Sequence, residues 1–324
     1  MQFTVDQSLL AQAATVPLQV IHWPRMEAHG IQVLVRRDDL IHPQLSGNKF
    51  YKLHHNLMEA KRQGHDTILS FGGAWSNHLY ALAAAGKIHG IKTLGIVRGE
   101  PQPTAMLKDA QNFGMKLKYW TREQFRQNKG EHIDSGLFDE LLNEFGRFYT
   151  IPEGGSNVLG AKGCAAISMA TELALNGDFS DICVACGTGA TLAGVAAGLS
   201  ADKTAWGLSV LKGQGSMAQE VANLVGTLCG KDSRQWHLVK GHHGGGYAKL
   251  KPELRSFMLN FEAQTGLLLD PIYTAKLFAG IETMAAEGVW KAGSRLVVVH
   301  SGGLQGRRGF EGLTPEAENV SLEY

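Results

Sequence analysis

Residues 181–194 read Asp-Ile-Cys-Val-Ala-Cys-Gly-Thr-Gly-Ala-Thr-Leu-Ala-Gly, and this stretch decides the fold class. Its first six residues form a nearly continuous apolar run, which is typical of a strand covered on both faces in a parallel sheet. A glycine-rich turn follows and opens a helix, so unpaired N–H groups and the positive end of the helix dipole suit an anion. By itself the turn favours phosphate binding and tight packing about equally.

The same strand-and-helix alternation extends in both directions from this stretch. Helical spacing of apolar residues occurs at 77–90 and 163–175. The expected strands are Ile31–Val35, Thr67–Phe71, Lys92–Val97, Lys116–Tyr119, Phe148–Ile151, Asp181–Cys186, Thr204–Ser209, Trp236–Val239 and Arg295–His300. This pattern predicts an α/β protein with two domains, each a mostly parallel twisted sheet flanked by helices. We expect a larger domain from 1–52 plus 153–324, and a smaller inserted domain from 53–152.

The composition limits the classes of function. The chain has 324 residues, 44% of them hydrophobic, with 31 Lys+Arg against 30 Asp+Glu and a net charge of +1. This apolar fraction excludes a disordered chain, and no basic enrichment supports a nucleic-acid or membrane-surface partner. The 40 glycines point instead to tight turns and close backbone approaches to a ligand. We therefore expect a soluble enzyme or small-molecule binder.

The start of the chain and its cysteines suggest a cytoplasmic protein. Residues 1–20 lack a basic segment and an uninterrupted apolar core, and we expect no apolar stretch of about 18 residues. Cys183 and Cys186 match a C-x-x-C spacing, but residues three apart on a strand point to opposite faces. We therefore interpret the cysteines as buried structural residues and expect no metal site.

A second glycine-rich turn lies at residues 71–78, Phe-Gly-Gly-Ala-Trp-Ser-Asn-His, again between a strand and a helix. Neither turn is a nucleotide motif. No Gly-Lys-Ser/Thr follows, and the G-x-G-x-x-G pattern fails because residue 192 is Leu and the acidic ribose partner about 20 residues on is missing. This disfavours a nucleotide-binding enzyme.

The segment 46–53, Ser-Gly-Asn-Lys-Phe-Tyr-Lys-Leu, places Lys49 where a helix begins. The positive end of a helix dipole lowers the pKa of a lysine and favours the nucleophilic neutral amine. Taken alone, Lys49 would be an ordinary solvated lysine.

Lys49 is not alone, because segment 46–53 resembles the G-G-N-K-x-R-K-L segment of the 1-aminocyclopropane-1-carboxylate deaminase / D-cysteine desulfhydrase family. These are fold-type II enzymes of pyridoxal 5′-phosphate, related in architecture to the tryptophan synthase β subunit. The resemblance covers most of the chain and includes R-D-D-L (37–40), G-A-W-S-N-H (73–78), I-P-E-G-G-S-N (151–157), G-T-G-A-T-L-A-G (187–194), G-G-Y (245–247), D-P-I-Y-T-A-K (270–276) and H-S-G-G (300–303).

The resemblance implies a role for each matching residue. Lys49 would bind the cofactor covalently and then act as the base at the substrate Cα, while Asn77 would bond the phenolic oxygen of the cofactor. Ser76, with the backbone of Asn77 and His78, would take the substrate carboxylate. The cofactor phosphate would lie in the second turn, which comprises Gly187, Thr188, Gly189, Ala190 and Thr191. The aromatic and ring-nitrogen contacts would come from Tyr247, Tyr273 and Ser301, with one tyrosine available for proton transfer.

Two of these positions bear on the reaction. Where the cyclopropane deaminases carry a glutamate for the ring nitrogen, this chain has Thr274, with Ser301 in the H-S-G-G motif. A hydroxyl stabilises a pyridinium charge less than a carboxylate does. The resemblance therefore implies α,β-elimination from a small amino acid such as D-cysteine, giving pyruvate, ammonia and sulfide.

Several alternatives stay open. They are 1-aminocyclopropane-1-carboxylate deamination, racemisation or β-replacement with the same cofactor, and a non-enzymatic ligand sensor. Tyr51, Ser46 and Trp75 depart from the family pattern close to the expected site, so the substrate could differ. The resemblance also implies a homodimer.

Overall fold

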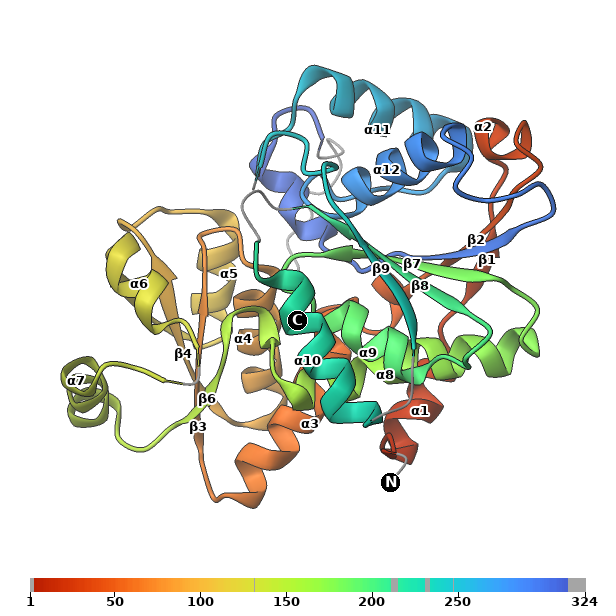
Figure 1. Cartoon of the computed structure of the whole chain (residues 1–324). Coiled ribbons are helices and arrows are strands. Elements are labelled where there is room, and N and C mark those ends of the chain that lie inside the picture. The colour runs from red at the N-terminus through yellow and green to blue at the C-terminus, as the bar shows by residue number, and fades with distance from the viewer. Residues whose placement is uncertain (1–2, 131, 211–214, 231–233, 247, 314–324) are drawn as a thin grey trace.

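A computed structural model of the chain describes residues 3–130, 132–210, 215–230, 234–246 and 248–313. Within these residues the chain forms a six-stranded and a four-stranded sheet, with helices on both faces of each (Figure 1). The α/β prediction is confirmed. Every strand predicted from the sequence is present, and no end differs by more than one residue.

The larger sheet has the strand order β1-β2-β10-β7-β8-β9. Its strands are β1 (Leu18–Val20), β2 (Gln32–Arg36), β7 (Asp181–Cys186), β8 (Thr204–Ser209), β9 (Gln235–Val239) and β10 (Arg295–Val299). All neighbours pair in parallel except β1, which runs antiparallel to β2 at the edge. Strand β1 was not predicted from the sequence.

Helices cover both faces of this sheet, as the apolar strands require. One core lies against α1 (Gln7–Ala14), α8 (Val158–Leu175), α9 (Ala190–Gly198) and α10 (Met217–Cys229). The other lies against α2 (Pro24–Glu27), α11 (Pro252–Thr265) and α12 (Thr274–Ala286). Cys186 belongs to the first core and Cys183 to the second, so the two thiols face opposite sides of β7 as predicted.

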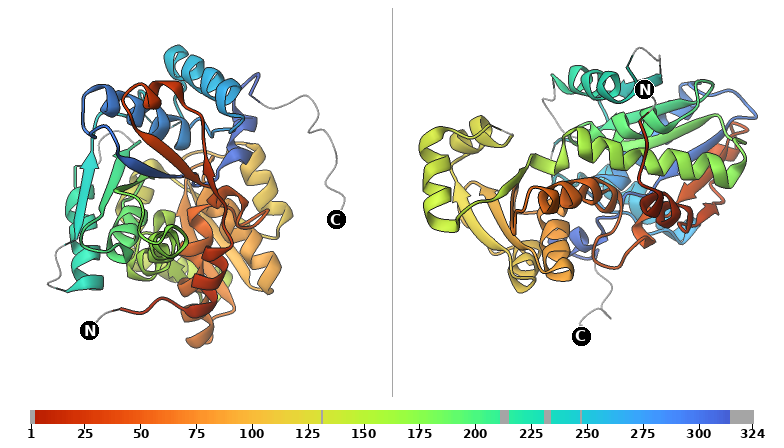
Figure 2. Two further views of the ribbon diagram at one scale, coloured as in Figure 1. Left: turned by 90° about the vertical axis from the view of Figure 1, so that its right-hand side faces the viewer. Right: turned by 90° about the horizontal axis from the view of Figure 1, so that it is seen from below.

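The smaller sheet, β5-β4-β3-β6, is parallel throughout. It consists of β3 (Thr67–Gly72), β4 (Lys92–Arg98), β5 (Lys116–Trp120) and β6 (Tyr149–Ile151). One face packs against α3 (Asn48–Arg62), α4 (Asn77–His89) and α5 (Ala105–Asn112), and the other against α6 (Arg122–Asn128) and α7 (Ser135–Phe145). Figure 2 (right) shows this sheet and its helices as a lobe beside the larger sheet.

All four strands of the smaller sheet lie within residues 67–151, inside the predicted domain 53–152. Helix α3 runs through the predicted limit at 52/53 and packs against α8 as well as the smaller sheet. The limits of the two domains therefore stay a prediction.

Helix α8 contradicts the expectation that no apolar stretch of about 18 residues occurs. Its 18 residues have a mean hydropathy of 1.3, enough by length and composition to cross a membrane, but 56% of them are buried inside the protein. The helix is apolar because it fills the core between α1, α3 and α9.

Candidate active site

A cavity of about 220 Å³ lies where the carboxyl ends of strands from both sheets meet. Ligand sites in open parallel sheets form at such strand ends. Loops after β3, β4 and β6 line one side, and loops after β7 and β10 line the other. The lining residues predicted from the sequence are Lys49, Ser76, Asn77, His78, Gly187, Thr188, Thr191, Tyr273 and Ser301.

Lys49 lies in the first turn of α3, as predicted, and its ammonium donates to Asn48 Oδ1 at 2.9 Å. Burial, followed by the positive charge of Lys52, lowers the pKa of Lys49 to about 7. The turn depends on Gly47, whose φ of +69° suits glycine and whose missing side chain leaves room for the carbonyl oxygen of Ser301. The loops that carry Lys49 and Ser301 are thus in direct contact.

Asn48 and Lys52 are among the residues that line the cavity and were missed from the sequence, together with Arg98, Lys129 and Glu153. Asn48 donates its amide N–H to Thr191 Oγ1 at 2.8 Å and so joins Lys49 to the second glycine turn. Lys52 is buried, and its ammonium donates to the carbonyl of Gly154 at 2.9 Å. Both lie within three residues of Lys49 in the segment 46–53, and this closeness in sequence could have identified them as site residues.

The first glycine turn leads from β3 into α4. Ser76 is the N-cap of α4, and its hydroxyl oxygen accepts the N–H of Leu79 at 3.2 Å. The N–H groups of Asn77 and His78 precede the first intrahelical hydrogen bonds, so they can bind an anion. Gly72 is needed here because a side chain would collide with Ser76.

The orientation of the Asn77 amide follows from a neighbour. Its Oδ1 accepts a hydrogen bond from Gln305 Nε2 at 3.1 Å, and Gln305 lies in the 3-10 helix η3 (Leu304–Gly309). With the oxygen engaged, the Nδ2 donor of Asn77 remains for a ligand in the cavity.

His78 is buried and neutral, because burial and then the charges of Lys49 and Lys52 hold its pKa well below the ordinary value. Ser70 Oγ donates to the carbonyl of Ile151 at 2.7 Å, so it accepts from His78 Nε2–H at 3.0 Å. The lone pair of His78 Nδ1 then has no partner among the described residues.

The second glycine turn leads from β7 into α9, and a glycine-rich helix start of this kind can form an anion cradle. Gly187, Thr188 and Thr191 line the cavity, whereas Gly189 and Ala190 do not. Gly189 is the N-cap of α9 with a φ of +88°, and Ala190 is the first residue of that helix. Their part in the cradle is to present backbone N–H groups at the helix start.

Tyr273 and Ser301 also line the cavity. The carboxylate of Asp270 accepts the N–H groups of Ile272, Tyr273 and Thr274, which fixes the backbone at Tyr273. The Thr274 hydroxyl bonds the backbone of Asp270 and does not line the cavity. Of Thr274 and Ser301, the cavity is lined by Ser301 alone.

Of the remaining sequence-derived residues, Tyr247 lies outside the described residues. Tyr51 does not line the cavity but is buried, where its hydroxyl donates to Asp38 and accepts from Arg36. Trp75 lines a neighbouring, more open cavity, and the Ser46 side chain lies against Gly302.

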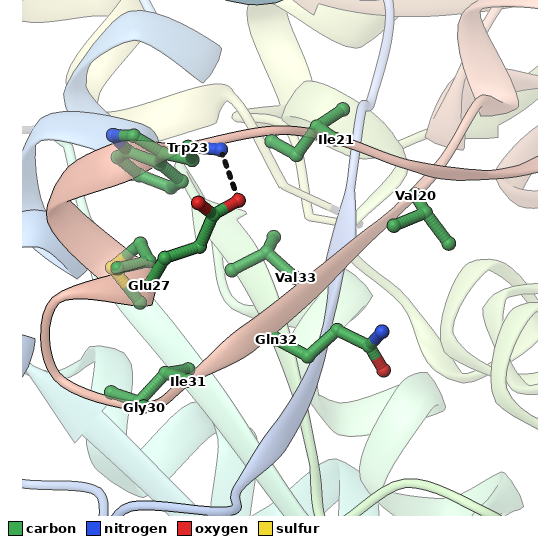
Figure 3. A pocket seen from close by; sticks show the side chains of 9 residues that line it. Val20, Ile21, Trp23, Glu27, Gly30, Ile31, Gln32 and Val33 are labelled. Carbon is green, nitrogen blue, oxygen red and sulfur yellow. Dashed lines mark hydrogen bonds between the residues drawn. The ribbon is translucent and has the colours of Figure 1, made fainter.

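A separate pocket of about 300 Å³ lies between β1, α2 and β2 (Figure 3). Its lining is mostly apolar and shares no residue with the site around Lys49. The Glu27 carboxylate there accepts the N–H of Trp23 at 3.2 Å and contacts His22 Nδ1 at 2.8 Å. Its one acidic group is thus already engaged, and the chemically active side chains lie around Lys49.

The residues present fit pyridoxal 5′-phosphate. The cavity combines a lysine whose pKa is lowered to about 7 with a glycine-rich helix start, and the buried cation of Lys52 lies beside them. An aldehyde that reacts with a neutral amine and carries a phosphate needs these groups.

Comparison with known proteins agrees with this fit. The family model described as pyridoxal-phosphate dependent enzyme matches residues 12–302, and the chain belongs to this family. Pyridoxal 5′-phosphate is therefore its cofactor.

Among relatives, the chain is 31% identical to the mitochondrial bifunctional D-cysteine desulfhydrase/1-aminocyclopropane-1-carboxylate deaminase of Arabidopsis thaliana, covering 86% of this chain and 74% of that protein. It is 28% identical to a D-cysteine desulfhydrase of Klebsiella pneumoniae, covering 90% and 92%. The crystal structure of an ACC deaminase homologue superposes with a TM-score of 0.77 at 26% identity, covering 93% and 96%. Both substrates in these names are small amino acids.

Proposed function

We propose that this chain is a lyase that catalyses α,β-elimination from a small amino acid such as D-cysteine, with release of pyruvate, ammonia and sulfide. The observation that carries the proposal is Lys49, a half-buried lysine with a pKa of about 7 that faces the cavity beside two helix starts. The names of the relatives support the same reaction class.

Two helix starts would bind the two anions of the reaction. We assign the substrate carboxylate to the N–H groups of Asn77 and His78 at the start of α4, with the Ser76 hydroxyl beside them. We assign the cofactor phosphate to the turn 187–191 at the start of α9. Lys52 would neutralise part of its charge, because its buried ammonium lines the same cavity.

The bound cofactor withdraws electrons and so makes the Cα proton of the substrate acidic. Lys49, as a neutral amine, then removes that proton, since a pKa of about 7 leaves the amine unprotonated in part at neutral pH. The Nδ2 group of Asn77 would donate to the phenolic oxygen of the cofactor. Tyr273 would flank the substrate.

Elimination is favoured over cyclopropane ring opening by the end of the cavity near Ser301. The one carboxylate lining the cavity among the described residues is Glu153, which pairs with Lys129 at 2.7 Å. A hydroxyl at the ring nitrogen supports less charge on the ring than a carboxylate would. The deaminase reaction remains the second candidate because relatives carry that name.

The test is keto-acid release from D-cysteine, L-cysteine and 1-aminocyclopropane-1-carboxylate, with sulfide assayed in parallel. We expect pyruvate and sulfide in equal amounts from D-cysteine, and neither from Lys49→Ala. Keto acid from the cyclopropane substrate alone would replace elimination by ring opening. Inversion of either cysteine without keto acid would point to a racemase.

We also propose a cytoplasmic homodimer that needs no nucleic acid or membrane. This rests on the family resemblance and on the net charge of +1. Light scattering of the purified holoenzyme tests the dimer. A mass near 35.1 kDa, that of a single chain, would contradict it.

A further inference from the structure

A second, more open cavity of about 770 Å³, called the outer cavity below, adjoins the cavity around Lys49. The two share Gly73, Arg98 and Lys129 in their lining. A substrate that reaches Lys49 by this route therefore passes through the outer cavity.

The outer cavity is lined by four cations, Arg98, Arg122, Arg126 and Lys129, and by one acid, Glu100. Lys129 is neutralised by Glu153 at 2.7 Å. Over the part of the chain that the structure describes, none of the three arginines forms an ion pair with a carboxylate. Among the described residues, three exposed guanidinium groups thus share one cavity with a single carboxylate, Glu100, and none of them is paired with it.

These arginines are exposed at the cavity, and their elements bring them to it. Arg122 and Arg126 are four residues apart in α6 and so lie on one face of that helix. Arg98 ends β4, and its Cζ lies 5.8 Å from the ring centroid of the buried Phe125, a residue of the same helix. Stacking on an aromatic ring orients a guanidinium group.

The two anions of the proposed reaction already have sites. The substrate carboxylate is assigned to the start of α4, and the cofactor phosphate to the start of α9 with Lys52. Neither assignment uses Arg122 or Arg126, which line the outer cavity and not the inner one. The arginines therefore remain for a third anion.

We infer that, in addition to small uncharged amino acids such as D-cysteine, this enzyme takes amino acids whose side chain carries a second negative charge, such as a phosphate, sulfonate or carboxylate. The inference rests on the proposed elimination. The planar guanidinium groups match the paired oxygens of such groups. For O-phosphoserine, Lys49 takes the Cα proton and the Cβ–O bond breaks with its electron pair leaving on phosphate. Water then replaces the nitrogen, so that substrate plus one water gives pyruvate, ammonia and phosphate.

The test compares O-phosphoserine with β-chloroalanine as substrates of the holoenzyme, using the D- and L-enantiomers of each. The side chain of β-chloroalanine is uncharged, and its elimination gives the same keto acid. We expect Arg98→Gln/Arg126→Gln to lower kcat/KM for O-phosphoserine relative to β-chloroalanine by about tenfold or more, mainly through KM, as loss of charged hydrogen bonds predicts. The comparison between variants cancels the difference in leaving group.

Arg147→Gln is the matched control. Arg147 is an exposed arginine of the same lobe that lines neither cavity, so its loss should leave the ratio of the two substrates unchanged. The inference is overturned if the ratio moves less than twofold in the double variant, or if the enzyme releases pyruvate from β-chloroalanine but not from O-phosphoserine.

If neither enantiomer of either compound yields keto acid, the proposed elimination fails. A binding measurement then tests the anion site separately. Calorimetry would then compare aspartate with alanine on the holoenzyme. Tighter binding of aspartate that disappears in the double variant supports an anion site, and equal binding of the two amino acids refutes it.

Discussion

Lys49 combines a half-buried position with a reactive amine, and its neighbour Lys52 contributes to the lowered pKa of that amine. The positive charge of Lys52 is the second cause, after burial, of the lowered pKa of Lys49. Since only the neutral amine reacts with the cofactor aldehyde, the rate of cofactor uptake by the apoprotein should rise with pH and reach half its maximum near pH 7, the pKa of Lys49.

Lys52→Gln should move this midpoint upward by about 0.5–1 pH unit, because a like charge no longer disfavours the ammonium form of Lys49. The measurement is the initial rate of change in cofactor absorbance from pH 6 to 10. Lys61→Gln, which alters an exposed lysine of the same helix, should leave the midpoint in place. An unchanged midpoint in Lys52→Gln would mean that burial alone sets the pKa.

Gln305 affects the cavity through Asn77, because its Nε2 group donates a hydrogen bond to Asn77 Oδ1 at 3.1 Å. Gln305→Glu replaces this donor by an acceptor, so the Asn77 amide should turn and present its oxygen to the phenolic oxygen of the cofactor. We expect the Kd of the cofactor to rise by about fivefold or more, the equivalent of about one hydrogen bond. Gln305→Leu leaves the amide free to rotate and should weaken binding less. Equal losses in both variants would show that Gln305 only fills space.

At the scale of elements, close contacts between α3, α8 and α9 position both Lys49 and the second glycine turn. A side chain at Gly163 would collide with the carbonyl of Tyr51, and one at Gly194 with the carbonyl of Ala161. Backbone atoms cannot move aside as flexible side chains do, so these glycines determine how closely the helices approach.

Gly194→Ala should therefore destabilise the protein by about 1–3 kcal/mol, the range for overpacking in a core. Gly226→Ala is the control, because Gly226 is an exposed residue inside α10 with open space around it. That change should instead stabilise the fold by about 0.5–1 kcal/mol, since alanine favours the helix. Urea unfolding of both variants tests this, and a neutral Gly194→Ala would indicate that α8 and α9 can separate at little cost.

The elements differ in how well their sequences predicted them. Strands such as β7 and β10 are apolar because both faces are buried, so composition alone reveals them. Strand β1 has three residues, and Val20 at its end is 58% exposed, so no alternating pattern could form. Helix α8 was apolar enough to resemble a membrane span because it is a core helix. In the site, the family motif gave Lys49, whereas the orientation of Asn77 depends on Gln305, which is distant in sequence.

For the whole molecule, the net charge of +1 conceals a local excess of positive charge. From composition one expects the anions to be held by backbone groups and helix ends, and α4 and α9 offer such sites. The fold adds the outer cavity, where Arg98 from β4 meets Arg122 and Arg126 from α6. Only the tertiary structure brings these residues together.

The cavity around Lys49 also joins the two sheets, since Ser76 and Asn77 come from the smaller one and Thr188 and Ser301 from the larger. A ligand bound by both sides stabilises them jointly. With free cofactor at a thousandfold excess over Kd, the fold should gain about 4 kcal/mol relative to the apoprotein. Each kcal/mol raises the Tm by about 2–4 °C in a chain somewhat smaller than this one, so we expect an increase of several degrees.

Calorimetry of the holoenzyme and apoprotein measures the increase, and hydrogen exchange locates it. Because both sheets contribute contacts, amide protection should rise in β3 and β4 as well as in β7 and β10. Lys49→Ala would keep the proposed phosphate site at α9 but lose the proposed covalent bond, so the cofactor should stabilise this variant less. Protection that rises only in the larger sheet would contradict the assignment of Asn77 and Ser76 to the bound molecules, because the smaller sheet would then gain nothing from the cofactor.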